Sequence, residues 1–225
     1  MAKVNVYKKP CVAVIADMVG SRKLLPAQRR VVQADFSRLI ARINRRHKTA
    51  ILAEFVITLG DECQGLLKDP AVLPDLIWNF DMTFPHATLR MGCGFGILYT
   101  GIGKQAINVD GPALHLARAA IDRAKKDKLL GGVFCGFGKR LDPILNGVGR
   151  LLWHQRSTLT RQEREVTKRL HVGLSQIEAA RELGITKQAV SLYAAKAGWD
   201  SYLGGEEAMR AALDFLRKGI DRIAS

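Results

Sequence analysis

Apolar runs and helical stripes alternate along the first 140 residues of the chain. Residues 11–16 form a continuous apolar run rich in β-branched side chains, which predicts a central strand covered on both faces. From residue 26 onward a long amphipathic helix is predicted by apolar residues at helical spacing, namely Val32, Phe36, Leu39, Ile40 and Ile43. Two strand-like stretches, 51–59 and 64–67, flank the charged turn at 60–62, which predicts a hairpin.

The same kind of pattern continues to residue 137. Residues 70–82 and 111–126 read as helices, and residues 89–98 and 132–137 read as strands. The order strand, helix, strand, strand, helix, strand is the ferredoxin-like βαββαβ arrangement, here with an added helix and strand. After residue 140 only helical patterns follow. We therefore predict an α+β fold, with a ferredoxin-like sheet domain over 1–140 and an all-α domain over 141–225.

Composition places the chain among globular proteins. It has 225 residues of which 48% are hydrophobic, enough for a real core. No stretch of eighteen apolar residues and no secretory signal pattern occurs, so we expect a cytoplasmic protein that does not enter a membrane. The four cysteines lie on separate apolar segments without the close pairing of a zinc site, and we expect buried thiols.

The chain is strongly basic, with a net charge of +14. Residues 1–150 carry 23 Lys and Arg against 12 Asp and Glu, a surplus of +11, and residues 151–225 carry 12 against 9, a surplus of +3. A basic excess attracts polyphosphates and nucleic acids. The alternative is a solvated surface, since the arginines of the helix that begins at residue 26 are typical of an exposed helix side.

Two carboxylates are expected to meet at one end of the sheet. Asp17 follows the first strand and Asp61 sits in the hairpin turn, on a strand predicted to lie beside the first. Such oxygen ligands suit Mg²⁺, or Mn²⁺, bound together with substrate phosphates. The loop after Asp17 offers backbone amides and one cation to an anion through Met18, Val19, Gly20, Ser21 and Arg22. Alternatively, Asp17 caps the following helix and Asp61 only forms a turn.

Four segments resemble, in order, the landmark segments of class III nucleotidyl cyclases: 15–21 (IADMVGS), 58–62 (TLGDE), 89–96 (LRMGCGFG) and 111–117 (GPALHLA). The hairpin also resembles those of diguanylate cyclases and polymerase palm domains, and the first two segments resemble the SatD family of bacterial proteins. The cyclase resemblance implies a two-metal site with Asp17 and Asp61 as ligands. It also implies a bound nucleoside triphosphate held by the loop after Asp17 and by Gly60, and a head-to-tail homodimer.

The chain departs from the cyclase pattern where catalysis is concerned. Ile57, a further nucleotide-binding position that the resemblance implies, stands where the family has its base-selecting lysine, so adenine is not read by that route. The positions of the transition-state asparagine and arginine hold His115 and Ala119, and Arg118 lies one residue away from the second. His115 and Arg118 are therefore the catalytic candidates, and the alternative for His115 is an ordinary histidine on the helix surface.

The C-terminal part carries three helix starts. Thr160 with Glu163 forms a predicted capping box, and Ser175 and Thr186 are predicted N-caps on either side of Gly184, which ends a helix. One face of the second helix would bury Ile177, Ala180 and Leu183, and one face of the third would bury Ala189, Val190 and Tyr193. A further amphipathic helix is predicted over 206–223.

Residues 159–199 resemble the helix-turn-helix of sigma-factor region 4 and of related response regulators. The resemblance implies DNA contacts from the helix starts and from the exposed side of the third helix, namely Ser175, Gln176, Thr186, Lys187, Gln188 and Ser191. Because the region's surplus charge is only +3, we expect a homodimer on two half-sites. The alternative is a helical hairpin that only packs or dimerises.

Three functions are compatible with this sequence. The first is a nucleotide-responsive DNA-binding regulator whose cyclase-like domain binds a nucleoside phosphate with Mg²⁺. The second is an active nucleotidyl cyclase or nucleotidyltransferase with altered transition-state residues, which Asp17 and Asp61 favour and Ile57 and Ala119 oppose. In the third, the cyclase-like domain has lost nucleotide binding and serves as a dimerisation scaffold.

Overall fold

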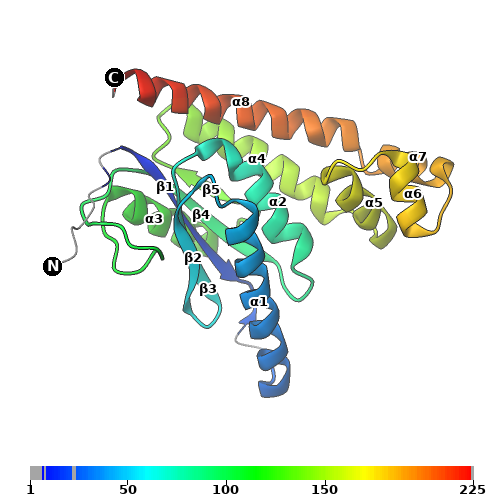
Figure 1. Ribbon diagram of the computed structural model, residues 1–225, viewed down its shortest axis with the longest axis horizontal. Coiled ribbons are helices and arrows are strands. Elements are labelled where there is room, and N and C mark those ends of the chain that lie inside the picture. Colours follow the sequence, from blue (N-terminus) through cyan, green and yellow to red (C-terminus); the bar gives the residue numbers. More distant parts are fainter. Residues whose placement is uncertain (1–6, 8, 22–23, 224–225) are drawn as a thin grey trace. The chain divides into compact units, whose positions relative to one another are not determined.

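A computed structural model describes residues 7, 9–21 and 24–223 of the chain (Figure 1). The chain forms two compact units. One comprises Met1–Arg150 together with Met209–Ser225, and we call it the sheet unit; the other, Leu151–Ala208, is the helical unit. The start of the fourth helix and the end of the last helix therefore belong to the same compact unit as the sheet. The predicted division into two functional domains after residue 140 stays a prediction. Within the described residues, no helix has the length and apolarity needed to cross a bilayer.

The sheet unit confirms the predicted order of elements. Its elements are β1 (Cys11–Met18), α1 (Pro26–Arg46), β2 (Ile51–Leu59), β3 (Glu62–Leu67), η2 (Pro70–Val72), α2 (Leu73–Thr83), β4 (Leu89–Gly96), α3 (Pro112–Lys126), β5 (Val133–Cys135) and the first part of α4 (Leu141–Ser157). The strands lie in the order β2-β3-β1-β4-β5. Strand β1 is antiparallel to both neighbours, and β5, the added strand, is parallel to β4. This is the ferredoxin-like arrangement that the sequence predicts.

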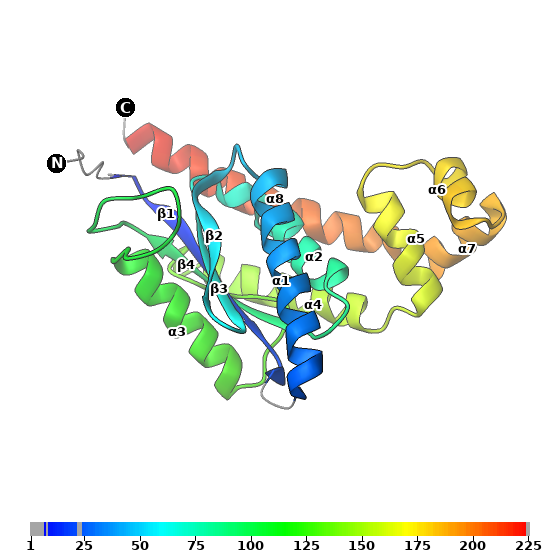
Figure 2. The same ribbon diagram turned by 60° about the horizontal axis from the view of Figure 1, so that its bottom comes forward.

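Helices cover both faces of the sheet (Figure 2). Alternate residues of β1 point to opposite faces, as the pleat of a strand requires. Val12 and Val14 belong to the core beneath α1 and α2, which includes Phe36 and Phe80. On the other face, Cys11, Ala13 and Ile15 pack with α3 in a second core. All eight residues of β1 are buried, which confirms the central strand predicted from its unbroken apolar run.

Helix α3 packs directly against the backbone of β4 because three glycines of the strand face it. A methyl group added at Gly94 would lie 2.2 Å from the carbonyl oxygen of Ala113 and 2.2 Å from the amide nitrogen of Ala117. Gly92 and Gly96 leave similarly little room to the backbone of α3. The contact between strand and helix is thus backbone against backbone, and it fixes the position of α3 over the sheet.

The cysteines are all free thiols. Cys11, Cys63 and Cys93 are buried, as predicted, and burial raises the pKa of Cys11 and of Cys93 to about 12. Cys135 is only half-buried, because β5 is the edge strand of the sheet. The thiols in the sheet core are therefore protonated, unreactive apolar groups.

The helical unit contains α5 (Arg161–His171), α6 (Gln176–Leu183) and α7 (Lys187–Lys196), with the end of α4 and the start of α8 (Trp199–Ile223). The caps are as predicted: Thr160, Ser175 and Thr186 each accept a hydrogen bond from a backbone amide at a helix start. Gly184 ends α6 in a left-handed conformation with φ of 66°. Helix α8 begins at Trp199, earlier than the predicted residue 206, and runs through Gly204 and Gly205.

One prediction about α6 is wrong. Ile177 is 58% exposed, and the residues that the helix buries are Ala179 and Ala180. Leu183 is half-buried. Helix α6 has only eight residues, so it contains too few apolar positions to define one face uniquely. The spacing of apolar residues therefore did not determine which side of the helix faces the core.

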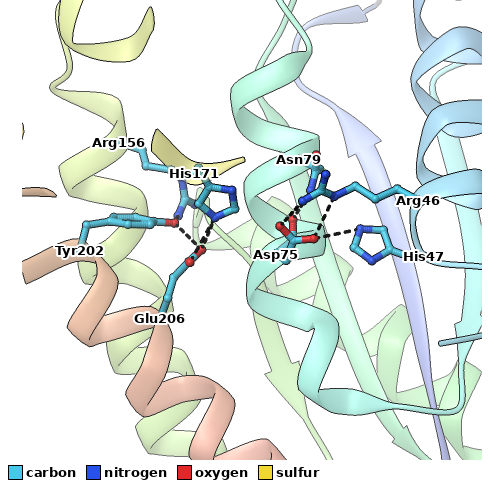
Figure 3. A network of polar contacts seen from close by, with 8 residues as sticks. All are labelled: Arg46, His47, Asp75, Asn79, Arg156, His171, Tyr202 and Glu206. Carbon is cyan, nitrogen blue, oxygen red and sulfur yellow. Dashed lines mark hydrogen bonds and ion pairs between the residues drawn. The ribbon is translucent and has the colours of Figure 1, made fainter. Parts of the chain in front are cut away.

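A buried polar network joins three helices of the helical unit (Figure 3). Arg156 of α4 donates a hydrogen bond of 2.8 Å from Nη1 to the hydroxyl of Tyr202. That hydroxyl donates to Glu206 Oε1 at 3.0 Å, and His171 Nε2 of α5 lies 3.2 Å from Glu206 Oε2. Because a buried polar group without partners is costly, these bonds specify how the three helices pack.

The close packing of α3 on β4 yields a prediction. Gly94→Ala forces the backbones of strand and helix apart, and we expect a loss of about 1–3 kcal/mol in the free energy of unfolding. Gly147→Ala is the control, since a methyl group there meets nothing within 4 Å and alanine favours the helix by roughly 0.5–1 kcal/mol. Urea denaturation of both variants measures the difference, and equal stability of the two would contradict the described packing.

Candidate functional site

Charged side chains from three strands gather at the carboxyl end of β1. Asp17, the last residue but one of β1, is paired across the sheet with Glu62 of β3 on one side and with Arg90 of β4 on the other. Only 8% of Asp17 is exposed and only 3% of Glu62. The antiparallel register of β1 with both neighbours thus brings two acidic groups and one basic group to the same end of the sheet.

Asp61 lies beside this group in the turn between β2 and β3. Its carbonyl oxygen accepts a hydrogen bond of 3.0 Å from the amide of Met18, and its carboxylate accepts one from the hydroxyl of Ser21. The hairpin turn is therefore tied to the loop that follows β1. Helix α1 has Leu25 as its N-cap, so capping is not the role of Asp17.

The carboxyl group of Asp17 has a raised pKa. Burial is the main cause, and the negative charge of Asp61 adds to it. Two cations act in the opposite direction, because Lys125 Nζ is 3.5 Å from Oδ1 of Asp17 and Arg90 Nη1 is 3.6 Å from Oδ2. Burial and the nearby Asp61 both disfavour the charged form of Asp17, so an added cation beside this carboxylate would bind favourably.

Glu62 is held by Arg118 of α3. The guanidinium group donates two hydrogen bonds, from Nη1 to Oε2 at 2.7 Å and from Nη2 to Oε1 at 2.8 Å. This contact lowers the pKa of Glu62 against the opposing effect of burial. The sequence pattern did not single out Glu62, because it placed this residue in the turn at 60–62 and began the next strand at residue 64. In the structure β3 begins at Glu62, and the antiparallel register places that residue opposite Asp17.

The two catalytic candidates lie in different places. Arg118 belongs to the charged group through Glu62, so its guanidinium is already engaged. His115 lies in the first turn of α3, where its Nε2 is 2.7 Å from Oδ1 of Asp110. That turn packs near Gly96, at the opposite end of β4 from Arg90. The structure therefore does not bring His115 to the carboxylates, and its catalytic role stays a prediction.

A cavity of about 180 Å³ opens beside Asp61. It lies between the loop after β1, the hairpin turn and α1, and it is lined by Met18, Ser21, Leu24, Arg29, Val32, Gln33, Gly60 and Asp61. Three predicted nucleotide-binding residues are thus among the lining residues. Arg29 and Gln33 were not predicted, although their spacing of four residues places them on one face of α1.

The remaining predicted nucleotide-binding residues lie elsewhere or are not described. Val19 donates a backbone hydrogen bond of 2.9 Å to the carbonyl of Thr88, and Gly20 has φ of 78°, which permits the sharp bend of the loop. Ile57 packs against the core rather than lining the cavity. Arg22 lies outside the described residues.

The arrangement can be compared with what Mg²⁺ or Mn²⁺ requires. Among the described residues no group of three or more His, Cys, Asp and Glu side chains could hold a metal ion. Mg²⁺ in nucleotide sites is commonly held by one or two carboxylates, with phosphates and water completing the shell. Asp17 and Asp61 match that smaller protein contribution, so the residues fit a cation that arrives together with phosphate.

In the helical unit, an exposed stripe follows α7. Lys187, Gln188, Ser191 and Leu192 are exposed, whereas Val190 and Ala194 are buried. Ser175 and Thr186 use their hydroxyl oxygens as helix caps, and Gln176 is half-buried in the first turn of α6. The exposed polar side chains of α7 therefore lie on the side of the helix away from Val190 and Ala194.

Comparison with known proteins gives one family. The SatD family matches residues 11–138. No curated protein is similar enough in sequence to count as a relative. The solved structures include a bacterial light-regulated adenylyl cyclase, at 13% identity and a TM-score of 0.42 over 57% of this chain and 76% of that one. Another is the regulator of polyketide synthase expression from Bifidobacterium adolescentis, at 14% identity and a TM-score of 0.29 over 94% and 81%. With TM-scores below 0.5, neither structure bears on what this chain binds.

The pair of Glu62 and Arg118 can be tested by mutation. Arg118→Ala leaves a buried carboxylate without its two hydrogen bonds, and we expect a loss of about 1–3 kcal/mol in the free energy of unfolding. Adding Glu62→Gln should restore part of it. Arg123→Ala on the same helix is the control, because its 3.6 Å ion pair with Asp127 is exposed and contributes less than about 1 kcal/mol. Equal losses in urea denaturation for Arg118→Ala and Arg123→Ala would contradict this assignment.

Proposed function

This chain belongs to the SatD family, and we propose that it is a nucleotide-responsive DNA-binding regulator. In this proposal the sheet unit binds a nucleoside phosphate together with Mg²⁺, and the helical unit contacts DNA through α7. The observation that carries the proposal is the cavity next to Asp61, where acidic, hydroxyl and basic groups face one small space.

The chemistry of this cavity favours a phosphate with a divalent cation. Asp61, with Asp17 beside it, would hold the cation, while the guanidinium of Arg29 offers hydrogen bonds to phosphate oxygens. The hydroxyl of Ser21 donates to Asp61 and so orients that carboxylate. A complete small-molecule pocket usually measures at least about 300 Å³. A cavity of about 180 Å³ therefore suits the phosphates and the cation and leaves the base outside.

Binding without cyclisation is favoured by the state of Arg118. A group that stabilises charge in a transition state has to be free to face the reacting phosphate. Here both terminal nitrogens of Arg118 donate to Glu62, and His115 pairs with Asp110. The second candidate, an active nucleotidyl cyclase or nucleotidyltransferase, draws its support from Asp17 and Asp61. Product analysis after incubation with each triphosphate distinguishes the two.

The helical unit supports DNA as the second partner. Glutamine and serine side chains such as those of Gln188 and Ser191 can hydrogen-bond base edges in a major groove, and the ammonium of Lys187 suits a phosphate. All three are exposed on one face of a short, capped helix. Since residues 151–225 have a surplus charge of only +3, one copy supplies few phosphate contacts, and a homodimer on two half-sites completes the proposal.

Nucleotide binding is tested by thermal unfolding with each nucleoside triphosphate, with and without Mg²⁺. We expect a Mg²⁺-dependent stabilisation of roughly 2.7 kcal/mol at one hundred times Kd. Asp17→Asn and Asp61→Asn should lose it. Glu54→Gln is the matched control, because its carboxylate lies on β2 in a 3.8 Å surface pair with Lys104. If no triphosphate stabilised the protein, the nucleotide-binding part of the proposal would be contradicted, and the sheet unit would serve only as a scaffold for DNA binding.

DNA binding is tested by fluorescence anisotropy on sequences selected from a random pool. Gln188→Ala should cost about 1–3 kcal/mol on the selected sequence and relax the preference at one base pair. Lys187→Ala should weaken binding to all sequences and lower the salt slope by about one. Lys139→Ala, an exposed lysine of the sheet unit, is the charge-matched control. Failure to enrich any sequence, with no salt-dependent binding, would contradict the assignment.

A further inference from the structure

Lys125 lies in the last turn of α3 and reaches into the charged group at the end of β1. Its Nζ is 3.5 Å from Oδ1 of Asp17 and 3.9 Å from Oε2 of Glu62. Nucleotide binding as proposed above assigns no task to this lysine. Its position is fixed by the packing of α3 on the glycines of β4, so the contact follows from the fold.

The charges of the group are matched in a particular way. Glu62 is neutralised by the two hydrogen bonds from Arg118. Each carboxylate oxygen of Asp17 has one cation within 4 Å, Lys125 at Oδ1 and Arg90 at Oδ2. Asp61, by contrast, has no cation of the described part of the chain within ion-pair distance. A divalent cation that binds beside Asp61 therefore finds the carboxylate of Asp17 already paired with Lys125 and Arg90.

The two cations on Asp17 differ in how easily they can leave. Arg90 is on the strand next to β1, and its side chain is 21% exposed. Lys125 is at the end of a helix, and its side chain is 39% exposed. An ammonium on a flexible four-carbon stem is strongly hydrated and moves into water at small cost. Lys125 is thus the cation that can give way.

We propose that Lys125 is a built-in counterion of Asp17, which occupies the carboxylate in the absence of a divalent cation and leaves when one binds. It thereby sets the affinity of the site for the cation. Mg²⁺ or Mn²⁺ bound to Oδ1 at about 2.1 Å would be close to an ammonium 3.5 Å from the same oxygen, and the two like charges repel. This inference rests on the proposed nucleotide and metal binding.

The test measures binding of Mn²⁺ alone, without nucleotide, by calorimetry and by the loss of its free electron-paramagnetic-resonance signal. Lys125→Met should raise the affinity for Mn²⁺ by about tenfold at low ionic strength. Lys125→Gln, which also removes the charge, should do the same, and Lys125→Arg should remain near the wild type. Lys126→Met is the matched control: it removes the same charge from the next, exposed residue of α3 and should change the affinity less than twofold.

The outcomes separate this inference from the function on which it rests. Wild type and Lys125→Met binding Mn²⁺ equally well would overturn the role of Lys125 and leave the metal site standing. Weaker nucleotide binding by Lys125→Met with unchanged Mn²⁺ affinity would make the lysine a phosphate ligand instead. Absence of Mn²⁺ binding from every variant would overturn the role of Lys125, while thermal unfolding with triphosphate and Mg²⁺ decides the proposed function separately. Tighter binding by Lys125→Met and Lys125→Gln, and not by Lys126→Met, supports both.

Discussion

Strand β1 is hydrogen-bonded to β3 on one side and to β4 on the other, and each of its eight residues is buried. This double pairing governs the rest of the sheet unit. It leaves no freedom of register, because a slip by one residue would exchange the side chains that face α1 with those that face α3. Because β1 is buried along its whole length, Asp17 near its end is a charged group with little access to solvent.

The structure meets that requirement with neighbouring charges rather than with solvent. Arg90 comes from the paired strand, and Lys125 comes from the helix that the glycines of β4 allow to approach. Glu62, the other buried acid, is matched by Arg118 from the same helix. Helix α3 therefore supplies the positive charge for two acids, so its close packing is as important to the site as the acids themselves.

The helical unit is built on a different principle. Its small helices have short apolar faces, and their starts are fixed by side-chain caps at Thr160, Ser175 and Thr186. The buried contacts among Arg156, Tyr202, Glu206 and His171 then select one packing among several that small apolar faces would allow. The outer side of α7, which we propose contacts DNA, takes no part in this buried packing.

Much of this protein could be predicted from the sequence alone. Hydrophobic periodicity and glycine-containing turns gave the order of strands and helices, and local capping patterns gave the starts of three helices, because these features depend on neighbours within a few residues. The meeting of Asp17 with the hairpin turn followed from the βαββαβ order. The buried side of α6 was wrongly predicted: Ile177 is exposed, because the spacing of apolar residues in a short helix does not specify which neighbour the helix packs against.

The partners of the charged groups were decided only by the tertiary structure. Register placed Glu62 opposite Asp17, helix packing brought Arg118 and Lys125 to them, and the cavity added Arg29 and Gln33 from α1. Each of these contacts joins residues distant along the chain, and each depends on distances of a few ångströms. A sequence pattern specifies which residues share a face of one helix or strand. The packing of the whole domain determines which faces meet and how far the elements are shifted along one another.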